Sequence, residues 1–424
     1  MQTLRPQPIA ASSFRLVCIA YGFLLLAVVT FWIDYAANQR GVVSYAYRTD
    51  FLGVYVGART VAIGHGMRVY DFDEQRAQMN EAVLPYRRGN LMPFIYPAYV
   101  ALLFWPVGML SFGHAVIGFE VLNLLIALWT ALLVALRLVT DERHRFLVLL
   151  AFFSFVPLSL TLFHNQLGLF VTLGIVQAVL AIRSHQLTRA GCWLLAGLIK
   201  PQLILFPLFV LLLWRCWRVL WPFFLGAGIV VGASFSVLGF WIPRYVGFLR
   251  EYNRGGAGLS LSPEAMQNWR GLLLFFLHRQ GLGFRMALAS LAAISLVAVV
   301  VVSTGQKIAP NWAKLACPPS KWWEPRFGIA ILLGLLSSPH LYMHDWIVFA
   351  PAGVLLWQPL KNSSHLSGRI IRVLLVACPF IFWFAQFGEW SLGISVPCVP
   401  FYMGIVGSAA FLALRKPELG TKTD

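Results

Sequence analysis

Long apolar runs recur from one end of the chain to the other, and short polar segments separate them. A helix that crosses a membrane needs about 20 predominantly apolar residues. The candidate spans are residues 14–33, 93–111, 113–136, 146–163, 166–183, 190–214, 217–242, 271–278 leading into 284–304, 326–338, 341–357, 370–387 and 392–414. The pattern therefore predicts an all-α polytopic membrane protein with about 10–12 transmembrane helices.

Three segments interrupt this pattern. Residues 34–92 and 243–270 are too long and too polar to be simple turns, and the basic, proline-rich segment 305–325 is typical of a cytoplasmic loop. Within residues 67–88 charges recur without a long apolar run, which indicates short amphipathic helices at a membrane surface. We expect a single transmembrane domain, residues 1–424, that carries two long loops on its outer side.

Lysine and arginine are enriched in the cytoplasmic loops of membrane proteins. This rule places the N-terminus and the basic segments in the cytoplasm, namely residues 214–218, 305–325, 361–372 and 414–418, and it places both long loops on the opposite face. Residues 137–145 and 183–189 are also basic, which is typical of cytoplasmic loops. If successive spans cross the membrane in alternating directions from the second span onward, however, at least one of these two segments must lie on the outer face. A re-entrant or broken segment would resolve this conflict, and residues 197–207 are a candidate.

The composition narrows the class of protein further. The chain is 59% hydrophobic and only 12% charged, so lipid is the solvent for most of it. The chain has a net charge of +17, but it contains no basic run and no aromatic–basic sheet motif of a nucleic-acid-binding domain. We therefore expect no nucleic acid partner. We expect instead an affinity for membrane lipids with anionic headgroups. The six cysteines stand singly without a CxxC pair, so neither a disulfide framework nor a zinc site is predicted.

Ionisable residues at or near membrane depth are costly, so each one is a candidate for function. Asp50 stands in the loop that follows the first span, among aromatic residues, glycines and arginines. It is either a functional carboxylate or an ordinary interfacial residue paired with Arg48 or Arg59. Lys200 stands among apolar neighbours beside Pro201, which breaks a helix, so its ammonium could face a polar cavity and meet a lipid phosphate.

Two histidine-containing segments offer polar groups for the same kind of site. His340 and His344 are four residues apart, and they would share a face if that stretch were helical. Asp345 is adjacent, but a third metal ligand is not obvious, so imidazole contacts to a phosphate are favoured over a metal. The alternative is a pair of capping or interfacial histidines after Pro339.

Two further groups interrupt apolar sequence. His164, Asn165 and Gln166 could hydrogen-bond sugar hydroxyls, or they could form a turn between two helices. Tyr96 and Pro97 stand at the expected start of a helix, where proline is common for structural reasons. This position alone assigns no chemistry to Tyr96. Tyr96 is a candidate contact to the sugar or acceptor only as part of the sequence motif that it begins.

Taken in order, these motifs resemble those of glycosyltransferase family 87, whose members use polyprenol-phosphate sugars and have the GT-C membrane fold. Individually the motifs are short, and their order and spacing carry the resemblance from about residue 47 to residue 352. Ala98, Asn165 and Asp345 are departures from the family pattern. The motifs are "DFLGVYVGARTVAIGHGMRVYD" from Asp50, "YPAYVALLFWPVGML" from Tyr96, "NQLGLFVTLG" from Asn165, "AGLIKPQLILFPLFVLLLWRCWR" around Lys200 and "SSPHLYMHDWIVFAP" around His344.

The resemblance implies inverting transfer of a hexose, most often mannose, from a polyprenyl-phosphate-linked sugar donor to a hydroxyl of a lipid or glycan acceptor. Asp50 would be the general base, although Asp71 or Asp73 in the same loop could share that role. The other implied site residues are Lys200, His344 and Arg59 for the donor phosphate, and Asn165, Gln166, His340 and Tyr96 for the sugar or acceptor.

The resemblance also implies a place and a set of partners. We expect a multi-pass protein of a bacterial inner (plasma) membrane with its active site facing the periplasm or exterior, and no metal or other cofactor. The alternatives are a secondary transporter or flippase and a non-catalytic scaffold. A transporter should show an internal repeat with paired helix breaks, and the loop around Asp50 has no counterpart in the second half of the chain.

Overall fold

The computed structural model describes residues 11–37, 41, 44, 46, 49–86, 89–254, 263–304, 317, 323–360, 366–392 and 397–414. The regular elements of this part are helices, and the longest are α1 (Ala11–Ala37), α7 (Phe112–Leu133), α13 (Trp217–Leu238), α16 (Leu282–Thr304) and α19 (Leu366–Leu392). Each of these five contains a stretch that is long and apolar enough to cross a membrane. The prediction of an all-α polytopic membrane protein is confirmed.

A sixth span is bent. Helices α8 (Glu142–Phe153) and α9 (Val156–Phe163) meet at 47°, and together they have the length and hydropathy of one crossing. Pro157 lies at the start of α9, where its missing N–H costs no hydrogen bond. The bend therefore falls where α8 ends and the proline begins a new helix.

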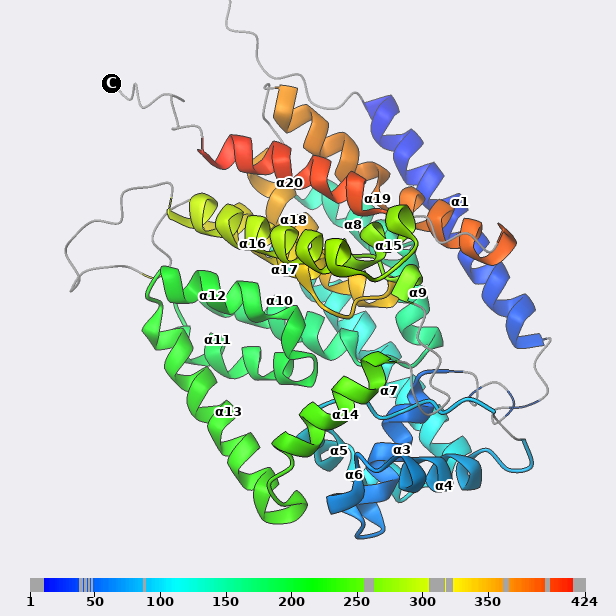
Figure 1. Ribbon diagram of the computed structural model, residues 1–424. Helices are drawn as coiled ribbons and strands as arrows, with labels where there is room; N and C mark the ends of the chain where they lie inside the picture. Colours follow the sequence, from blue (N-terminus) through cyan, green and yellow to red (C-terminus); the bar gives the residue numbers. More distant parts are fainter. Residues whose placement is uncertain are drawn as a thin grey trace, which may run out of the picture.

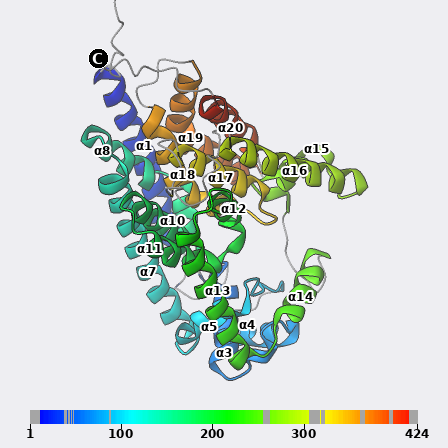
Figure 2. The same cartoon turned by 90° about the vertical axis from the view of Figure 1, so that its left-hand side faces the viewer.

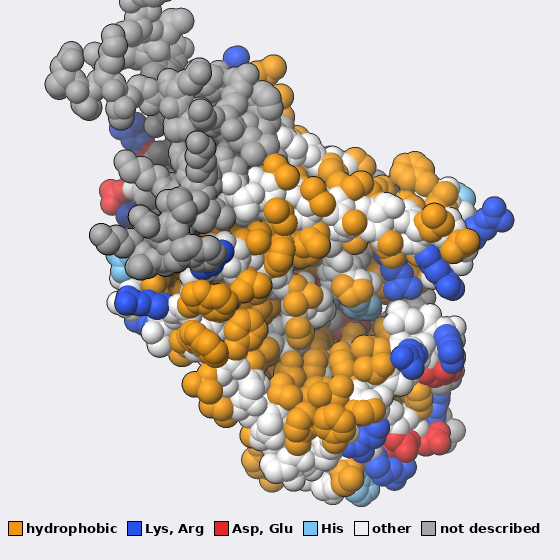
Figure 3. Space-filling view, turned by 60° about the vertical axis from the view of Figure 1, so that its left-hand side comes forward, with side chains coloured by type: hydrophobic (Ala, Val, Ile, Leu, Met, Phe, Trp, Pro, Cys, Tyr) orange, Lys and Arg blue, Asp and Glu red, His pale blue; other side chains and the backbone are white. Residues whose placement is uncertain are grey.

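Shorter helices fill the interior between these long ones. They are α10 (Gly168–Arg183), α11 (Leu187–Leu194), α12 (Leu205–Leu213), α15 (Trp269–Leu277), α17 (Trp323–Ser337), α18 (Phe349–Leu360) and α20 (Val399–Leu414). All but two residues of α17 are buried, whereas α1 and α16 expose large apolar side chains such as Phe23 and Ile294. Figure 1 shows α10 and α17 inside and α1 at the periphery. Hydrophobic side chains also cover the face in Figure 3, as a surface in contact with lipid requires.

The predicted span 93–111 is wrong. The structure divides it into α5 (Ala98–Leu103) and α6 (Trp105–Gly108), which begin at Pro97 and near Pro106. Both short helices pack on α3 (Phe51–Ala62), where Gly108 lies so close that a Cβ atom on it would be 2.4 Å from the backbone of Ala58. This stretch belongs to the same assembly as the first long loop, and α7 is the next crossing after α1.

Removing that span resolves the conflict in topology. After α7, the bent α8–α9 pair and α10, residues 137–145 and 183–189 come to the same end of the molecule. Arg183 donates to the carbonyl of Leu138 at 3.0 Å and pairs with Glu324 at 2.7 Å. Thr140 also donates to Gln358 at 2.8 Å. Both basic segments therefore lie together with the start of α17 and the end of α18, in agreement with their charge.

The predicted helix break at Lys200 is confirmed. Between α11 and α12 the chain forms two short 3₁₀ turns, η3 (Leu195–Ile199) and η4 (Pro201–Leu203), and Lys200 between them has φ −134° and ψ 77°. Proline disfavours the helical conformation in the residue before it. Residues 190–214 are consequently a broken segment that carries the Lys200 ammonium inward instead of a continuous span.

The two long polar loops meet at the other end of the molecule. Figures 1 and 2 show α3, α4 (Phe72–Ala82) and α14 (Ile242–Arg254) together there. The Tyr245 hydroxyl on α14 donates to the carbonyl of Ile95 at 3.1 Å, and the rings of Tyr245 and Tyr70 lie 5.1 Å apart. The short helices η1 (Gly66–Arg68) and α4 occur where surface helices were predicted. The assignment of this end to the outer face stays a prediction.

One expectation about the cysteines is wrong. Cys216 and Cys317 form a disulfide, although they are 101 residues apart and neither belongs to a CxxC pair. The end of α12 and the last turn of α16 lie side by side, since Trp214 donates to the carbonyl of Ser303 at 3.3 Å. This pairing depends on tertiary structure that residue spacing does not reveal. Most of the predicted loop 305–325 lies outside the described residues.

Asp71 caps α4, and this role gives a test of the loop fold. Its Oδ1 accepts hydrogen bonds from the backbone N–H groups of Asp73 and Glu74, both at 3.0 Å. The bond from Glu74 is the main reason that the pKa of Asp71 lies below its ordinary value. The stabilisation is therefore present above the ordinary aspartate pKa, and it is lost as the pH falls through the lowered value.

We expect Asp71→Ala to destabilise α4 by about 1 kcal/mol. Hydrogen exchange of the amides in Phe72–Ala82 measures this effect locally, and those amides should exchange faster in the variant. Asp71→Asn is the matched control, because asparagine is an equally good N-cap. Equal protection in Asp71→Ala and the wild type would contradict the capping role.

Candidate active site

Asp50 lies immediately before α3, at the end where the two long loops meet. Its backbone is helical, with φ −68° and ψ −17°, and its side chain makes no capping bond to α3. The start of α3 is fixed by close packing, because a Cβ atom on Gly53 would be 2.6 Å from the carbonyl oxygen of Pro93. The carboxylate is thus held in position by the backbone and left available for other partners.

The partner of Asp50 comes from the turn between α9 and α10. Asn165 in this turn has φ +49°, a left-handed conformation that asparagine tolerates better than most residues, and Asn123 donates to its side-chain oxygen at 3.4 Å. The backbone N–H of Gln166 donates to Thr161 at 2.8 Å. This geometry directs the Gln166 side chain to Asp50, where Nε2 donates to Oδ2 at 2.6 Å.

Lys200 connects this pair to a second carboxylate. Its Nζ donates to Gln166 Oε1 at 2.8 Å and to Asp345 Oδ1 at 2.6 Å. Lys200 and Asp345 are only 5% and 1% exposed, so each compensates the charge of the other in a poorly solvated place. A lysine ammonium has three donors, which leaves one beyond these two bonds.

Tyr96 closes the group from the side of α5. Its hydroxyl donates to Gln166 Oε1 at 3.3 Å, and its ring centroid lies 5.8 Å from Lys200 Nζ, within the range of a cation–π contact. Tyr70 fixes the backbone beside it by donating to the Tyr96 carbonyl at 2.9 Å. The two polar loops thereby position a residue that contacts both Gln166 and Lys200.

Asp345 reaches this group because Gly168 leaves room for it. The segment η6 (Met343–Val348) packs against the start of α10, where a Cβ atom on Gly168 would be 3.1 Å from Ile347 and 3.9 Å from Asp345 Oδ1. The Thr161 hydroxyl also donates to the backbone carbonyl of His344 at 2.9 Å. The distance of η6 from α9 and α10 is therefore set by Gly168 at one contact and by the hydrogen bond from Thr161 at the other.

The histidines lie beside the two carboxylates. His344 Nε2 is 3.6 Å from Asp345 Oδ2, and the rings of His344 and His164 are 6.0 Å apart. The Nδ1 atom of His164 is buried and has no hydrogen-bond partner among the described residues. His340 does not share a helix face with His344, because residues 338–342 are not helical. Its ring instead lies 4.9 Å from that of Tyr342.

The remaining candidates lie away from this group. Arg59 is more than two turns along α3, where it donates to the carbonyl of Gly108 at 3.2 Å and lies 3.7 Å from Glu81. The structure therefore does not bring Arg59 to Asp50. Asp71 caps α4, and the Asp73 side chain is exposed. Arg48, the other predicted partner of Asp50, lies outside the described residues.

The electrostatic environment keeps Asp50 ionised. Burial raises the pKa of its carboxyl, but His164, His344, the hydrogen bond from Gln166 and the charge of Lys200 all lower it, and the net pKa lies below the ordinary aspartate value. Asp50 is consequently a carboxylate at neutral pH, with Oδ2 bound to Gln166 and with no hydrogen bond to Oδ1 from the residues that the structure describes. That is the form in which a carboxylate can accept a proton.

Two polar residues of the second loop support the site, and the sequence did not single them out. Asn268 donates to the carbonyl of Ser338 at 2.8 Å, and Trp346 donates to the carbonyl of Gln267 at 3.0 Å. Both Gln267 and Asn268 are buried. They fix the chain on either side of His344, and their only signal in the sequence is a polar pair beside Trp269.

Asp50 is partly exposed, whereas Lys200, His344 and Asp345 are buried. Figure 3 shows a hollow between the upper and lower parts of the molecule, with histidine and acidic side chains visible inside it. Within the part of the chain that the structure describes, no three His, Cys, Asp or Glu side chains are grouped to hold a metal ion. The prediction that the protein needs no metal was not tested by this observation and stays a prediction.

Comparison with known proteins gives the class of this site. The profile of glycosyltransferase family 87 matches residues 94–317, which is more than half of the chain and includes Tyr96, Gln166 and Lys200. Two relatives are each named polyprenol-phosphate-mannose-dependent alpha-(1-2)-phosphatidylinositol pentamannoside mannosyltransferase. No solved structure matches the chain.

Both relatives are similar over most of their length. The protein from Mycolicibacterium smegmatis is 25% identical over 352 residues, which cover 76% of this chain and 75% of the relative. The protein from Mycobacterium tuberculosis is 24% identical over 331 residues, which cover 71% of this chain and 68% of the relative. The chain therefore belongs to glycosyltransferase family 87 and is a membrane hexosyltransferase, as its motifs indicate.

Proposed function

We propose that this enzyme transfers mannose from a polyprenyl-phosphate-linked donor to a hydroxyl of a lipid or glycan acceptor, with inversion at the anomeric carbon. The donor follows from the names of the two relatives, which are polyprenol-phosphate-mannose-dependent. The observation that carries the proposal is the buried chain of hydrogen bonds from Asp50 through Gln166 and Lys200 to Asp345, beside His164 and His344.

Asp50 is the general base in this proposal. The acceptor hydroxyl gives its proton to Asp50 Oδ1 while its oxygen forms a bond to the anomeric carbon. The bond from that carbon to the phosphate oxygen breaks, and the electron pair leaves with the polyprenyl phosphate. Attack from the face opposite the phosphate inverts the configuration. The lowered pKa of Asp50 keeps its carboxyl ionised, which is the form that accepts the proton as the acceptor oxygen becomes bonded.

Gln166 is a positioning residue for that base. It donates to one oxygen of the Asp50 carboxylate at 2.6 Å, while its own oxygen accepts from Lys200 and Tyr96. The amide cannot turn over without breaking these bonds, since Nε2 would then face two donors. The orientation of Asp50 is thus fixed by three elements that are distant in the sequence.

The leaving phosphate gains negative charge as the bond breaks, and preorganised donors stabilise such charge. His344 and His164 offer ring N–H groups beside the two carboxylates, and Lys200 offers its third N–H. The ammonium is shared with Asp345 at 2.6 Å, and burial disfavours the charged form of an imidazole, so the two histidines act as neutral N–H donors in this proposal. Because phosphate is a good leaving group with such donors, the proposed reaction needs no metal or other cofactor.

The proposed location is the non-cytoplasmic face of a bacterial inner membrane. The basic segments around Arg137 and Arg183 gather at the end opposite the site, as the distribution of positive charge in membrane proteins favours for a cytoplasmic end. A transporter or flippase is not favoured, because the matching family consists of glycosyltransferases. His340 and Asn165 are the proposed contacts to sugar or acceptor.

The first test removes the base. Purified protein is offered polyprenyl-phosphate-mannose with phosphatidylinositol mannosides, and sugar transfer is measured for the wild type, Asp50→Asn and Asp73→Asn. We expect Asp50→Asn to lower kcat by about 10²–10⁴-fold, because asparagine cannot take the proton. Asp73→Asn is the matched control and should keep wild-type activity, since its side chain is exposed.

Two results would count against this assignment: full activity of Asp50→Asn, or an equal loss in Asp73→Asn. Polyprenyl-phosphate-glucose serves as the second donor. If no wild-type transfer occurs from either donor, the proposed donor class is wrong.

The second test addresses Gln166. Replacement by leucine removes a hydrogen bond to a charged group, so we expect kcat to fall by about 10- to 100-fold with little change in KM. Loss of the donated bond should also raise the pKa of Asp50. The acid limb of the pH profile of kcat/KM should therefore move to higher pH.

Gln166→Glu is the companion variant, because it keeps the size of the side chain but cannot donate to Asp50 when ionised. It should resemble Gln166→Leu in its pH profile. A loss of activity without any movement of the acid limb would mean that Gln166 acts only on the fold.

A further inference from the structure

A polar pocket lies at the end of the molecule opposite the candidate active site. It is formed by the end of α7 with the π-helical turn η2 (Val134–Leu138), by the end of α10 and by the start of α11. Its volume is about 340 Å³, within the range of ligand pockets. We call this space the basic pocket, because Arg137 and Arg189 line it and no acidic residue does.

Close packing holds the three helices around the basic pocket. A Cβ atom on Gly174 of α10 would be 2.7 Å from the carbonyl oxygen of Trp193 on α11. The ring of Trp193 lies 6.5 Å from that of Trp129 on α7, measured between centroids. The three helices thus contact one another beside the pocket, and its walls are held by the bundle.

The positive charge of the basic pocket has no carboxylate to balance it. Glu324 lies at the same end of the molecule, but Arg183 engages it at 2.7 Å. Within the described part of the chain, Arg137 and Arg189 form no ion pair, and Arg189 donates only to the side-chain oxygen of Gln186, at 3.1 Å. Two guanidinium groups that line one pocket repel each other, so an anion between them is stabilised by both.

The backbone around the basic pocket also favours an anion. The last carbonyls of α10 are satisfied by its capping turn, in which the N–H groups of Gln186 and His185 donate to Ala181 and Ile182, at 2.8 and 3.0 Å. Arg183 donates to two carbonyls of η2, at 3.2 and 3.0 Å. By contrast, the first N–H groups of α11 have no acceptor within the helix, and the Gln186 side chain at its N-cap makes no capping bond.

The surface next to the basic pocket is apolar. Leu133 and Leu180 belong to the pocket wall, and Trp129 is one turn before Leu133 on α7. Trp129 is 48% exposed, and Leu125 on the same helix is 59% exposed, so this face of α7 contacts lipid. Tryptophan is enriched at the boundary between headgroups and acyl chains. The order of charged and apolar side chains therefore matches the order of phosphate and acyl chain in a phospholipid.

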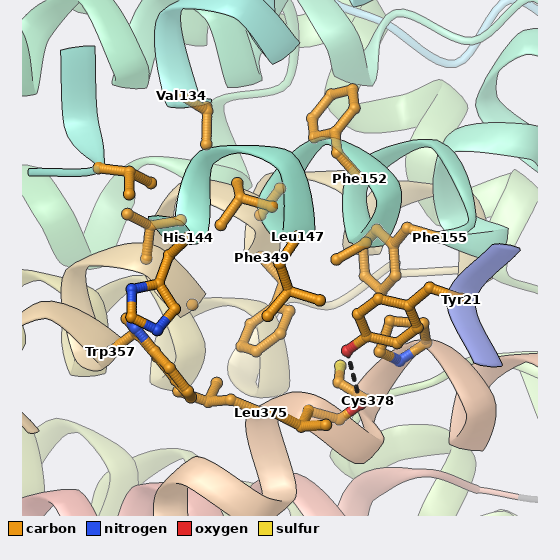
Figure 4. Close-up of a pocket in the computed structure, with 18 residues that line it drawn as sticks. Tyr21, Val134, His144, Leu147, Phe152, Phe155, Phe349, Trp357, Leu375 and Cys378 are labelled. Carbon is orange, nitrogen blue, oxygen red and sulfur yellow. Dashed lines mark hydrogen bonds between the residues drawn. The ribbon is translucent and has the colours of Figure 1, made fainter. Parts of the chain in front are cut away.

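A neighbouring apolar cavity offers no comparable site for an anion. Figure 4 shows Leu147, Phe152 and Phe349 among its walls, together with Val134 from η2. Its volume is about 120 Å³, smaller than that of the basic pocket. The turn η2 thus presents Val134 to the apolar cavity and Arg137 to the basic pocket, and only the basic pocket provides donors for a charged group.

We propose that the basic pocket binds the phosphate group of an anionic phospholipid, with Arg137 and Arg189 as its two cationic contacts. Guanidinium groups suit a phosphate, because their paired N–H groups match its oxygens. Gln177 and Ser184 in the wall provide further polar contacts to the headgroup, and the acyl chains lie on the apolar surface of α7. Basic pockets between membrane helices recognise anionic headgroups in this way. The site does not depend on the proposed sugar transfer.

Native mass spectrometry of the purified full-length protein in detergent measures this binding without a sugar donor. The protein is titrated with dioleoyl phosphatidylglycerol, dioleoyl phosphatidylcholine or inorganic phosphate. We expect the Kd of the first phosphatidylglycerol to be about tenfold lower than that of phosphatidylcholine, whose choline group is repelled by the arginines. Arg137→Gln and Arg189→Gln should each raise the Kd for phosphatidylglycerol by about tenfold, because each removes hydrogen bonds to a charged group.

Arg143→Gln is the matched control. Arg143 is an exposed arginine of α8 at the same end of the molecule, but it does not line the pocket, so its replacement should leave the Kd unchanged. An equal rise in all three variants would mean a general attraction of lipid to this end and would overturn the proposal. No rise in Arg137→Gln and Arg189→Gln would also overturn it. If Arg137→Gln does not fold, Arg189→Gln decides the question from a different helix.

The inorganic phosphate arm separates the two sources of a phosphate group. Free phosphate has the same oxygens but no acyl chain, so we expect it to bind much more weakly than phosphatidylglycerol. Equal affinity for the two would mean that the basic pocket takes a soluble anion, which contradicts the assignment to a lipid.

Discussion

The buried ion pair between Lys200 and Asp345 is the constraint on which the arrangement of the site depends. Two unit charges that are almost inaccessible to solvent need each other, and their 2.6 Å contact fixes the break between α11 and α12 against η6. Gln166 extends this pair to Asp50. Four segments that are far apart in the chain thus meet because the positive charge of a lysine buried in a membrane protein needs a negative partner.

The breaks in the helices follow from the same requirement. A continuous helix satisfies its own backbone and presents its side chains to lipid or to other helices, so it is a poor place for a lysine that must reach a carboxylate. Pro157 and Pro201 end regular helices, and Gly168 lets η6 approach α10. The outer helices remain long and apolar, while the interior consists of shorter pieces whose ends deliver polar groups to one place.

The fold class could be predicted from hydropathy, because a lipid environment leaves few alternatives to helices. The separate importance of Asp50 and Lys200 was visible too, since charges beside apolar runs are rare. Their connection through Gln166 was not, because it depends on the left-handed turn at Asn165. The predicted span 93–111 was wrong because hydropathy does not distinguish a helix exposed to lipid from apolar sequence packed on α3. Arg59 was placed near Asp50 by sequence proximity, but the helix turns it toward Glu81.

A double-mutant cycle at Lys200 and Asp345 tests most directly whether this pair organises the site. Lys200→Met and Asp345→Leu should each destabilise the protein by about 3–5 kcal/mol, because each leaves one buried charge without its partner. The double variant should recover most of that stability, yet transfer no sugar, since Gln166 has lost the ammonium that orients it. Thermal unfolding and mannose transfer measured on all four proteins decide the matter. Additive losses of stability, or wild-type transfer by the double variant, would contradict this role for the pair.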